Sequence, residues 1–489
     1  MQSPIFVGFN EDRSKSGQDD VCINLYPEFT IGPKGPMSNL LITTQGLTAP
    51  LVTIGTGPIR GVYVAANDLM YVVSANQLFS VNQFWTATLL GAIFTGTGPV
   101  SFIDNPTQLL VVDGISGWMW DKAALTLTSV IPNTDTDCTL PNVAVYQDGF
   151  GLVNSAMSNQ IYQSNYNDLS KYATLNGTGL GSTANNAYIQ GNARNVVTMF
   201  DMKREVWIFK SDAVEVWINN GNAGFAFVML QGIFPATGCL AAASVARLDA
   251  GLAWLGGNDD GGRTVYMSVG YQAKPISTFA LGQLFQSFVT VSDAIAYSYQ
   301  SDRHYFYVLT FPTANQTWVY DLASEQWHQR AYFLNGAFSR ERANCHTYYN
   351  GTHVVGDYQN GNLYAMSDNV YTDNGTRRKW VRSWRALSDD TPRIPMSFDS
   401  LQILLETGIT APSGTNPQIM LRWSDDGGYT WTGAFQVPAG KIGETAWRAI
   451  QNRLGSTKIQ TGLDRVWEIS GSDPMQIKIT GAEWTGGPA

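Results

Sequence analysis

Five cationic side chains and two tryptophans lie within nine consecutive residues, a combination that can hold single-stranded nucleic acid. The cations would contact phosphates while the tryptophan rings stack on bases. The residues concerned are Arg377, Arg378, Lys379, Trp380, Arg382, Trp384 and Arg385. The alternative, which we favour, is a strand at a domain boundary with one charged, solvated side and partly packed tryptophans. Because Arg and Trp are enriched in interface hot spots, the same strand is predicted to lie near a contact with a partner protein.

A second motif, at residues 424–431, could belong to an enzyme that cleaves glycosides. It fits the Ser-X-Asp-X-Gly-X-Thr-Trp pattern of an Asp box, known from sialidases, through Ser424, Asp426, Gly428, Thr430 and Trp431. A glycosidase needs two carboxylates at a defined separation, but this box occurs once, and in such enzymes it lies away from the catalytic site. We therefore interpret it as a structural hairpin, in which Asp426 accepts hydrogen bonds from turn amides and Trp431 packs on the strand.

The other residue types that support catalysis show no motif spacing. The four histidines, none of which sits in an HExxH pattern or beside a cysteine pair, are His304, His328, His346 and His353. The Gly-rich stretches 55–61 and 177–181 miss the spacing of phosphate-binding loops, and no GxSxG elbow is present. We therefore predict no catalytic residue, no metal ligand and no cofactor, which indicates a protein that is not an enzyme.

The composition limits the partners that the chain can have. Only 14% of its 489 residues are charged, against about 25% in an average globular protein. The net charge of −9 argues against nonspecific DNA binding, because that binding needs a basic face to neutralise phosphates. An acidic chain remains compatible with a wall that DNA slides past. No segment approaches about 20 consecutive apolar residues, so we expect no membrane span.

The cysteines indicate a reducing compartment. Cys22, Cys138, Cys239 and Cys345 are far apart and form no CxxC pair. Secreted disulfide scaffolds and zinc modules use denser spacing, so we interpret all four as free thiols.

One strand–turn–strand–turn–strand unit recurs between about residues 58 and 370. Its seven copies cover residues 61–81, 99–121, 142–164, 195–218, 244–269, 294–321 and 345–367. A spacing of roughly 40 to 55 residues is typical of four-stranded propeller blades. The pairs Asp148-Gly149, Asn350-Gly351 and Asn360-Gly361 tolerate the positive φ that tight hairpins require. The sequence therefore predicts an all-β fold, a β-propeller of about seven blades with six to eight left open; a pure sandwich is the alternative.

Two regions lie outside the repeats. Residues 1–57 are predicted to form an N-terminal arm with few strands, ahead of propeller repeats over residues 58–375. Residues 376–489 contain at least four further strand candidates and are predicted to form a C-terminal β-sandwich. The polar stretch 169–191 is predicted to be a long loop between blades, and no segment shows sustained helical periodicity.

Several segments, in their order along the chain, are similar to one phage protein family. They include CINLYPE at residues 22–28, EVWIFKSDAVEVWINNGNAGFAF at 205–227, LRWSDDGGYTWTG at 421–433 and RVWEISGSDPMQIKITGAEW at 465–484. The chain resembles the packaged-DNA stabilisation proteins of short-tailed phages, also called tail hub or nozzle proteins. The resemblance extends over nearly the whole chain.

This resemblance implies a structural role in a virion tail assembled in the host cytoplasm. Such proteins form a homo-oligomeric ring, usually of six copies, below the portal and its head-to-tail adaptor. The ring closes the DNA channel until ejection, carries tailspikes or fibres and a central needle or plug, and conducts DNA without sequence-specific binding. The family has no catalytic residues to carry over. The competing hypothesis is a glycan-binding or sialidase-like β-propeller.

Overall fold

The computed structural model describes most of the chain. The described residues are 1–6, 8, 20–30, 38–132, 138–172, 186–189, 191, 193–222, 224–233, 235–257, 261–387, 395–410, 413–457 and 465–488. Most of the loop predicted at residues 169–191 therefore lies outside them, as does the Gly-rich stretch 177–181.

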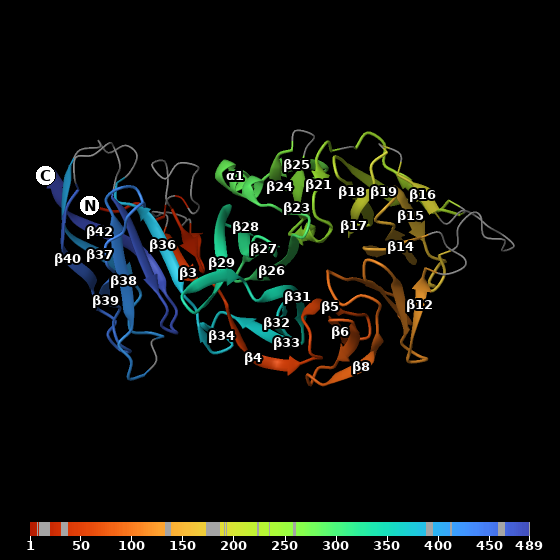
Figure 1. Cartoon of the computed structure of the whole chain (residues 1–489), viewed down its shortest axis with the longest axis horizontal. Coiled ribbons are helices and arrows are strands. Elements are labelled where there is room, and N and C mark those ends of the chain that lie inside the picture. The colour runs from red at the N-terminus through yellow and green to blue at the C-terminus, as the bar shows by residue number, and fades with distance from the viewer. Residues whose placement is uncertain are drawn as a thin grey trace.

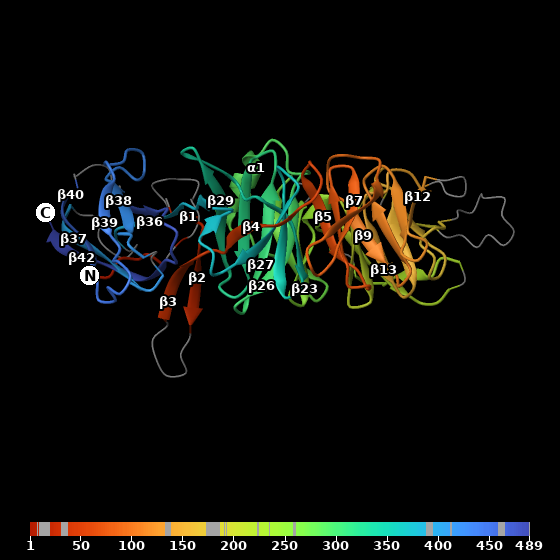
Figure 2. The same ribbon diagram turned by 90° about the horizontal axis from the view of Figure 1, so that it is seen from below.

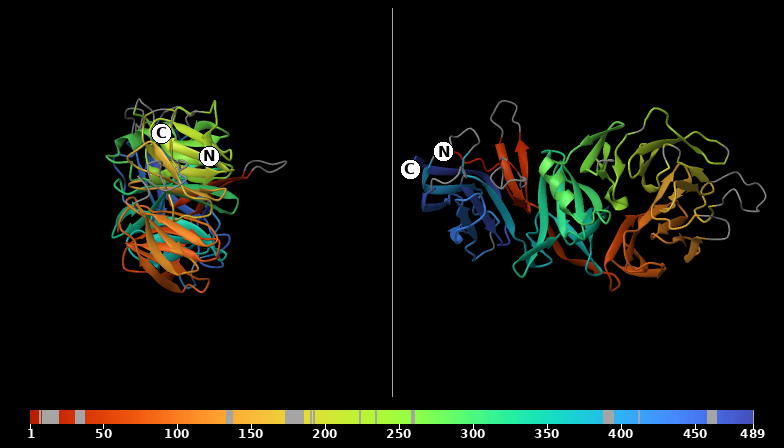
Figure 3. Two further views of the ribbon diagram at one scale, coloured as in Figure 1. Left: turned by 90° about the vertical axis from the view of Figure 1, so that its right-hand side faces the viewer. Right: turned by 45° about the horizontal axis from the view of Figure 1, so that its top comes forward.

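The molecule is elongated and has two parts, a ring of sheets and a second β module at one end (Figures 1 and 2). Both chain termini lie in the second module, which is also clear when the molecule is tilted (Figure 3). The predicted all-β propeller fold is confirmed. Around the ring, the described residues form seven four-stranded antiparallel units, which we number blade 1 to blade 7.

The blades follow one another along the chain, and each runs from an inner to an outer strand. Blade 1 contains β5 (Ile59–Val64), β6 (Met70–Ser74), β7 (Gln77–Val81) and β8 (Ala87–Ala92). Blade 2 contains β9 (Ser101–Asp104), β10 (Gln108–Val112), β11 (Gly117–Asp121) and β12 (Thr126–Ile131). Blade 3 contains β13 (Ala144–Gln147), β14 (Phe150–Asn154), β15 (Gln160–Gln163) and β16 (Asn186–Tyr188). Blade 4 contains β17 (Val196–Met202), β18 (Glu205–Lys210), β19 (Val214–Asn219) and β20 (Phe227–Met229).

The next two blades carry additions to this plan. In blade 5 the inner strand is divided into β21 (Gly238–Cys239) and β22 (Ala246–Leu248), which are joined by the 3₁₀ turn η1 (Ala242–Ser244). The remaining strands of this blade are β23 (Gly251–Gly257), β24 (Arg263–Val269) and β25 (Gln272–Pro275). Blade 6 contains β26 (Ile295–Ser301), β27 (His304–Phe311), β28 (Gln316–Asp321) and β29 (Gln326–Leu334), whose far end also pairs with β30 (Ala337–Arg340).

Blade 7 is completed from the other end of the sequence. Its strands β31 (Ala343–Tyr349), β32 (Thr352–Asp357) and β33 (Asn362–Ser367) are followed outward by β4 (Gly46–Thr53), which precedes blade 1 in the chain. The short strands β34 (Thr372–Asp373) and β35 (Thr376–Arg377) extend this sheet. The inner strand β5 of blade 1 packs beside β31. The ring is thus closed by joining early and late segments within one blade.

Each blade is buried on both faces, which explains why its strands read as apolar runs. In β10, for example, Leu109 to Val112 are four consecutive residues with no solvent exposure. Alternate residues point to opposite faces, so Leu109 and Val111 pack against blade 1 while Leu110 and Val112 pack against blade 3. Seven apolar clusters of this kind each combine residues of two neighbouring blades. The core of the ring therefore lies between its blades.

The turn predictions are confirmed at two of the three pairs. Asp148-Gly149 and Asn350-Gly351 adopt positive φ, at 50° and 88° and at 49° and 73°, as tight hairpins require. The prediction is wrong for Asn360-Gly361, neither of which has positive φ. Gly361 is needed for a different reason, because a Cβ there would lie 2.0 Å from the carbonyl oxygen of Ile54 on the closing segment.

One α-helix occurs among the described residues, and the sequence pattern did not predict it. This helix, α1 (Phe279–Ser287), is capped by Thr278, whose hydroxyl accepts from the amide of Leu281 at 3.3 Å. Leu281 and Phe285 bury one face against blades 5 and 6. With nine residues and a glycine inside, it is too short to show helical periodicity. No helix in the described part of the chain is long and apolar enough to cross a membrane.

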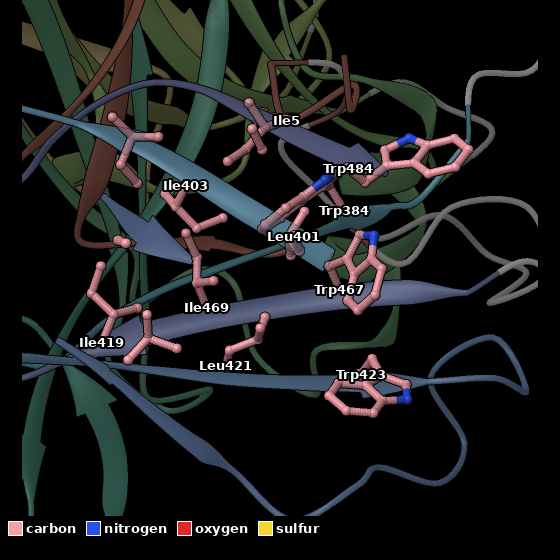
Figure 4. Packing of buried hydrophobic residues seen from close by; sticks show 14 of the residues in the cluster. Ile5, Trp384, Leu401, Ile403, Ile419, Leu421, Trp423, Trp467, Ile469 and Trp484 are labelled. Atoms are coloured by element: carbon pink, nitrogen blue, oxygen red, sulfur yellow. The ribbon is translucent and has the colours of Figure 1, made fainter. Parts of the chain in front are cut away.

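The second module is a sandwich of two sheets. One sheet has the order β2 (Leu25–Thr30), β3 (Ser38–Thr43), β42 (Lys478–Pro488), β37 (Met396–Leu405) and β40 (Ala449–Ser456). The other continues from blade 6 through β1 (Cys22–Ile23), β36 (Trp380–Arg385), β41 (Val466–Gly471), β38 (Gln418–Ser424) and β39 (Phe435–Pro438). Trp384, Trp467 and Trp484 pack with aliphatic side chains between the two sheets (Figure 4).

Among the first 57 residues, those that the structure describes include four strands, and these strands belong to the sheets of the two modules. Strand β1 joins the sheet of blade 6 to the second module, β2 and β3 extend the outer sheet of that module, and β4 completes blade 7. These segments place polar and charged side chains from distant parts of the chain at one junction.

Candidate functional site

The Asp-box residues form a closed hydrogen-bond network in the connection between β38 and β39. Asp426 accepts from the Ser424 hydroxyl at 2.6 Å, from the Thr430 amide at 2.8 Å and from the Thr430 hydroxyl at 2.6 Å. The Gly428 amide donates to the Ser424 hydroxyl at 2.8 Å, and the Trp431 indole donates to the Gly428 carbonyl at 3.1 Å. Both oxygens of Asp426 therefore serve the turn, as the hairpin interpretation requires.

The hydrogen bonds of this turn favour the ionised form of the Asp426 carboxyl. Desolvation alone would raise the pKa of Asp426, but the hydrogen bonds from Ser424 and Thr430 outweigh it and lower the pKa to about 2. The neighbouring carboxylates are paired with arginines: Asp425 with Arg465 at 2.6 and 2.9 Å, and Glu468 with Arg422 at 2.7 Å through both oxygens. Carboxylates held in this way act as structural anions and are poorly placed to donate a proton.

The basic and tryptophan-rich segment lies largely inside the chain. Trp384 and Arg382 have no exposed surface, while Trp380 and Arg378 are at least nine-tenths buried. Arg377 is exposed and pairs with Asp473 at 3.2 Å, Lys379 lies over the rings of Phe333 and Phe338, and Arg385 is half-buried. Strand β36 is central because β1 and β41 pair with its two edges. The expectation of a strand with a solvated charged side does not describe these buried residues.

The buried part of this segment is a joint between distant pieces of the chain. Arg382 donates twice to the carbonyl of Ile5, at 2.9 and 2.6 Å, and the Trp384 indole donates to the Ser3 hydroxyl at 2.8 Å. Ile5 itself is fully buried in the sandwich core. A buried guanidinium needs such partners, since an unpaired buried charge is strongly destabilising. Arg382 and Trp384 of β36 thus hold the start of the chain in the second module.

A second set of contacts joins the propeller to that module. Arg378 donates to the carbonyl oxygens of Thr44 and Gln45 and pairs with Asp373 at 3.3 Å. Asn24, in a left-handed conformation with φ of 57°, donates to the carbonyls of Ala331 and Lys379, both at 2.8 Å. These bonds link blade 6, the N-terminal segment and the beginning of β36 within one polar cluster.

Buried charge continues from this cluster into the propeller. Arg330 is fully buried, lies 3.8 Å from Glu341 and donates to the Tyr299 hydroxyl and to Gln45. Burial raises the pKa of Asp373 to about 6, although Arg378 acts to lower it. The junction is therefore an internal, charged site in which burial makes the Asp373 carboxyl easier to protonate.

All four histidines gather at blades 6 and 7, which the sequence did not reveal. Burial acts to lower the pKa of His304, but its hydrogen bond of 2.7 Å to Asp321 outweighs this and raises the pKa. Burial, with Arg330 and His304 nearby, lowers the pKa of His328 well below 6.5. His346 and His353 face each other at 3.0 Å, and burial lowers the pKa of His346 to about 3. His346 and His353 lie on the paired strands β31 and β32 of blade 7, whereas His304 and His328 lie on β27 and β29 of blade 6, which packs against blade 7.

Within the described ranges, no group of three or more His, Cys, Asp or Glu side chains is arranged to hold a metal ion. The four cysteines are free, and burial raises the pKa of each thiol, to about 12 for Cys22, Cys138 and Cys345 and about 11 for Cys239. Cys22, Cys138 and Cys239 are buried, and neutral, buried thiols are chemically inert.

Comparison with known proteins gives one family match and several distant alignments to solved structures. A family model described as "Bacteriophage P22 Gp10, beta-propeller" matches residues 1–371. No curated protein is similar enough in sequence to match the chain. Among solved structures, the Neurospora crassa Pan2 WD40 domain aligns with a TM-score of 0.40 and 11% identity, covering 63% of this chain and 89% of that domain. The WD40 β-propeller domain of Doa1 aligns with a TM-score of 0.37 and 13% identity, covering 66% and 96%.

Proposed function

This chain belongs to the phage stabilisation family of the Bacteriophage P22 Gp10 β-propeller, and we propose that it is a structural tail protein that helps to retain packaged DNA. The observation that carries the proposal is the family match, which spans residues 1–371 and so includes all seven blades and the segment that closes the ring. The buried polar cluster at the junction supports the proposal, because its charged side chains hold the two modules together and are not exposed to a ligand.

In this proposal the chain assembles as a homo-oligomeric ring, of six copies, below the portal and the head-to-tail adaptor. The ring seals the channel with the help of a needle or plug, carries tailspikes or tail fibres, and conducts DNA during ejection. It belongs to the virion tail, is assembled in the host cytoplasm and has no catalytic role. An exposed Arg377 at the end of the basic segment is the residue of that segment best placed for a partner contact.

The charge of the chain suits a conduit for DNA. A basic channel would hold phosphates through many ion contacts and slow their passage. Each copy carries a net charge of −9, and a ring of copies would repel DNA within roughly a Debye length of about 8 Å. We propose that the surface facing the channel of the assembled ring is neutral to acidic and that retention comes from a separate plug.

The proposal is tested with phage particles that lack this chain. A stop codon early in its gene should yield heads that package DNA and then lose it, measured as nuclease-sensitive DNA in purified particles. Supplying the wild-type chain in trans should restore retention. Depleted particles that keep their genome in a stable, infectious form would refute the proposal, and so would an assembled channel lined by Arg and Lys.

A further inference from the structure

His328 is a buried histidine whose ring has no hydrogen-bond partner. It lies on β29 of blade 6 and has no exposed surface. Neither ring nitrogen has a partner in the described part of the chain, although buried polar side chains are normally hydrogen-bonded. The fold accommodates this ring in its neutral form. A charged ring would be far less favourable there, because an unpaired buried charge is strongly destabilising.

Two residues of the N-terminal segment contact blade 6 beside this histidine. The Asn24 amide donates to the Gln329 carbonyl at 2.8 Å, and the Ala331 amide donates to the Asn24 side-chain oxygen at 3.0 Å. Tyr26 is 4% exposed, and its ring centroid lies 6.1 Å from that of His328. Among the described strands, β2 pairs only with β3, so β2 has no strand pairing of its own with blade 6. We call this contact of Asn24 and Tyr26 with β29 the seam.

The charges nearest to His328 oppose a second proton on its ring. Arg330 lies two residues further along β29 and so on the same face of the strand. His304 on β27 is hydrogen-bonded to Asp321 at 2.7 Å, which engages that carboxylate. Burial, Arg330 and His304 all lower the pKa of His328, to well below 6.5. An imidazolium at this position would lie close to the Arg330 guanidinium and would have no carboxylate bonded to it.

The other charged and titratable groups on this side of blade 6 offer the ring no acceptor either. None of them is hydrogen-bonded to His328 in the described structure. Glu341 faces Arg330 at 3.8 Å and Asp373 faces Arg378 at 3.3 Å, so both acidic groups have cationic partners of their own. The remaining groups are Glu28 on β2, Tyr299 on β26, Asp302 before β27, Arg342 before β31 and Asp368 after β33.

We infer that the seam is a contact that opens in acid, because His328 takes up a proton only when Asn24 and Tyr26 leave β29. In the closed seam the ring stays neutral. In the open seam it meets water and titrates at the ordinary histidine value of about 6.5. The stability that the seam owes to a neutral His328 is therefore fully present above pH 6.5 and is lost as pH falls below it. Acidification loosens the N-terminal segment from blade 6, and neutral pH restores the contact.

The size of the effect follows from this one proton. For a ring that titrates at about 6.5 in the open seam and far lower in the closed one, the opening equilibrium rises about 30-fold between pH 7.5 and pH 5.0. The amides of Asn24 and Ala331 report opening directly, because their hydrogen bonds cross the seam. Their hydrogen-exchange protection, corrected for the intrinsic exchange rate at each pH, should fall about 30-fold over this range. It should recover when the pH returns to 7.5.

The test compares the full-length wild-type chain with three variants. His328→Leu removes the titrating ring and leaves an apolar side chain, so the protection of the two seam amides should change by less than about 3-fold between pH 7.5 and pH 5.0. His328→Gln makes the same test with a neutral polar side chain and replaces the leucine variant if that one does not fold. His346→Asn is the matched control. His346 faces His353 in blade 7, so its removal should leave the 30-fold fall at the seam as it is in wild type.

Low concentrations of urea separate opening of the seam from unfolding of the whole chain. Exchange through a local opening depends little on urea, whereas exchange through global unfolding rises steeply with it. Seam amides that share the urea dependence of Leu110 and Val111 in blade 2 would overturn the inference. A wild-type change of less than about 3-fold with pH would also overturn it, and so would an unaltered fall in both His328 variants. The proposed retention of DNA does not depend on any of these results.

Discussion

Replacement of Trp384 by alanine should destabilise the sandwich module selectively. The side chain has no exposed surface, lies between the two sheets and donates a 2.8 Å hydrogen bond to the Ser3 hydroxyl. A buried Trp→Ala change costs about 3–5 kcal/mol in unfolding free energy, because a cavity replaces the ring. For a unit of roughly 150–250 residues, each 1 kcal/mol lowers Tm by about 2–4 °C, so we expect the module to lose at least about 6 °C.

The assay must resolve the two modules, because a chain of this size need not unfold in one step. Hydrogen exchange followed by mass spectrometry reports each strand separately. The amides of β36, β41 and residues 1–6 should lose protection in Trp384→Ala, while those of β10 and β14 in the propeller should keep it. Trp384→Phe is the matched control: it keeps most of the ring volume and loses the hydrogen bond, which is worth about 1 kcal/mol.

Two outcomes would refute this reasoning. A Tm lowered by less than about 2 °C with unchanged protection of β36 would mean that Trp384 is not a core residue. Equal loss of protection in propeller and sandwich would mean that the two modules unfold as one unit. If Trp384→Ala also fails to assemble on the portal and adaptor, the Phe variant shows whether that failure follows from lost stability, because Phe should restore both.

The sites and the ring closure described above give four further predictions. Asp426→Ala should lower stability by about 1 kcal/mol, with no hydrolysis of a fluorogenic sialoside by either protein; hydrolysis by wild type that an acidic-residue change abolishes would contradict the hairpin interpretation. Burial lowers the pKa of His346 to about 3 from an ordinary 6.5, so its contribution to stability is present above pH 6.5 and is lost as pH falls toward 3. His346→Asn should therefore weaken the dependence of Tm on pH between pH 4.5 and 7.5. An unchanged slope of Tm against pH would refute this. Asp373, whose pKa is raised to about 6 from 3.8, acts in the opposite sense, so Asp373→Asn should increase the loss of stability on acidification from pH 6 to 4. Deletion of residues 1–53 should expose the edge of β33 and raise hydrogen exchange in blade 7 before blade 3, whereas equal exchange would argue against ring closure by β4.

Local patterns were enough to predict much of the fold. The hairpins could be predicted because Asn350-Gly351 and similar pairs determine turn geometry within four residues. The repeat spacing indicated radial closure, since a blade with two buried faces needs neighbours on both sides. The Asp-box turn could also be predicted, because Asp426 reaches only Ser424 and Thr430, two and four residues away. Burial on both faces appeared in the sequence as apolar runs such as that of β10.

Only the tertiary structure determined which segments complete which sheets. The sequence of β4 carries no information on which sheet edge the strand joins, and it pairs with β33 some 300 residues later. The basic segment suggested a solvated surface for the same reason. Arg382 donates a hydrogen bond to Ile5, and Trp384 donates one to Ser3, across more than 370 residues. Their burial depends on partners that composition cannot identify, because a charge enters the core only where the fold supplies acceptors. The grouping of four histidines likewise depends on the packing of blade 6 against blade 7.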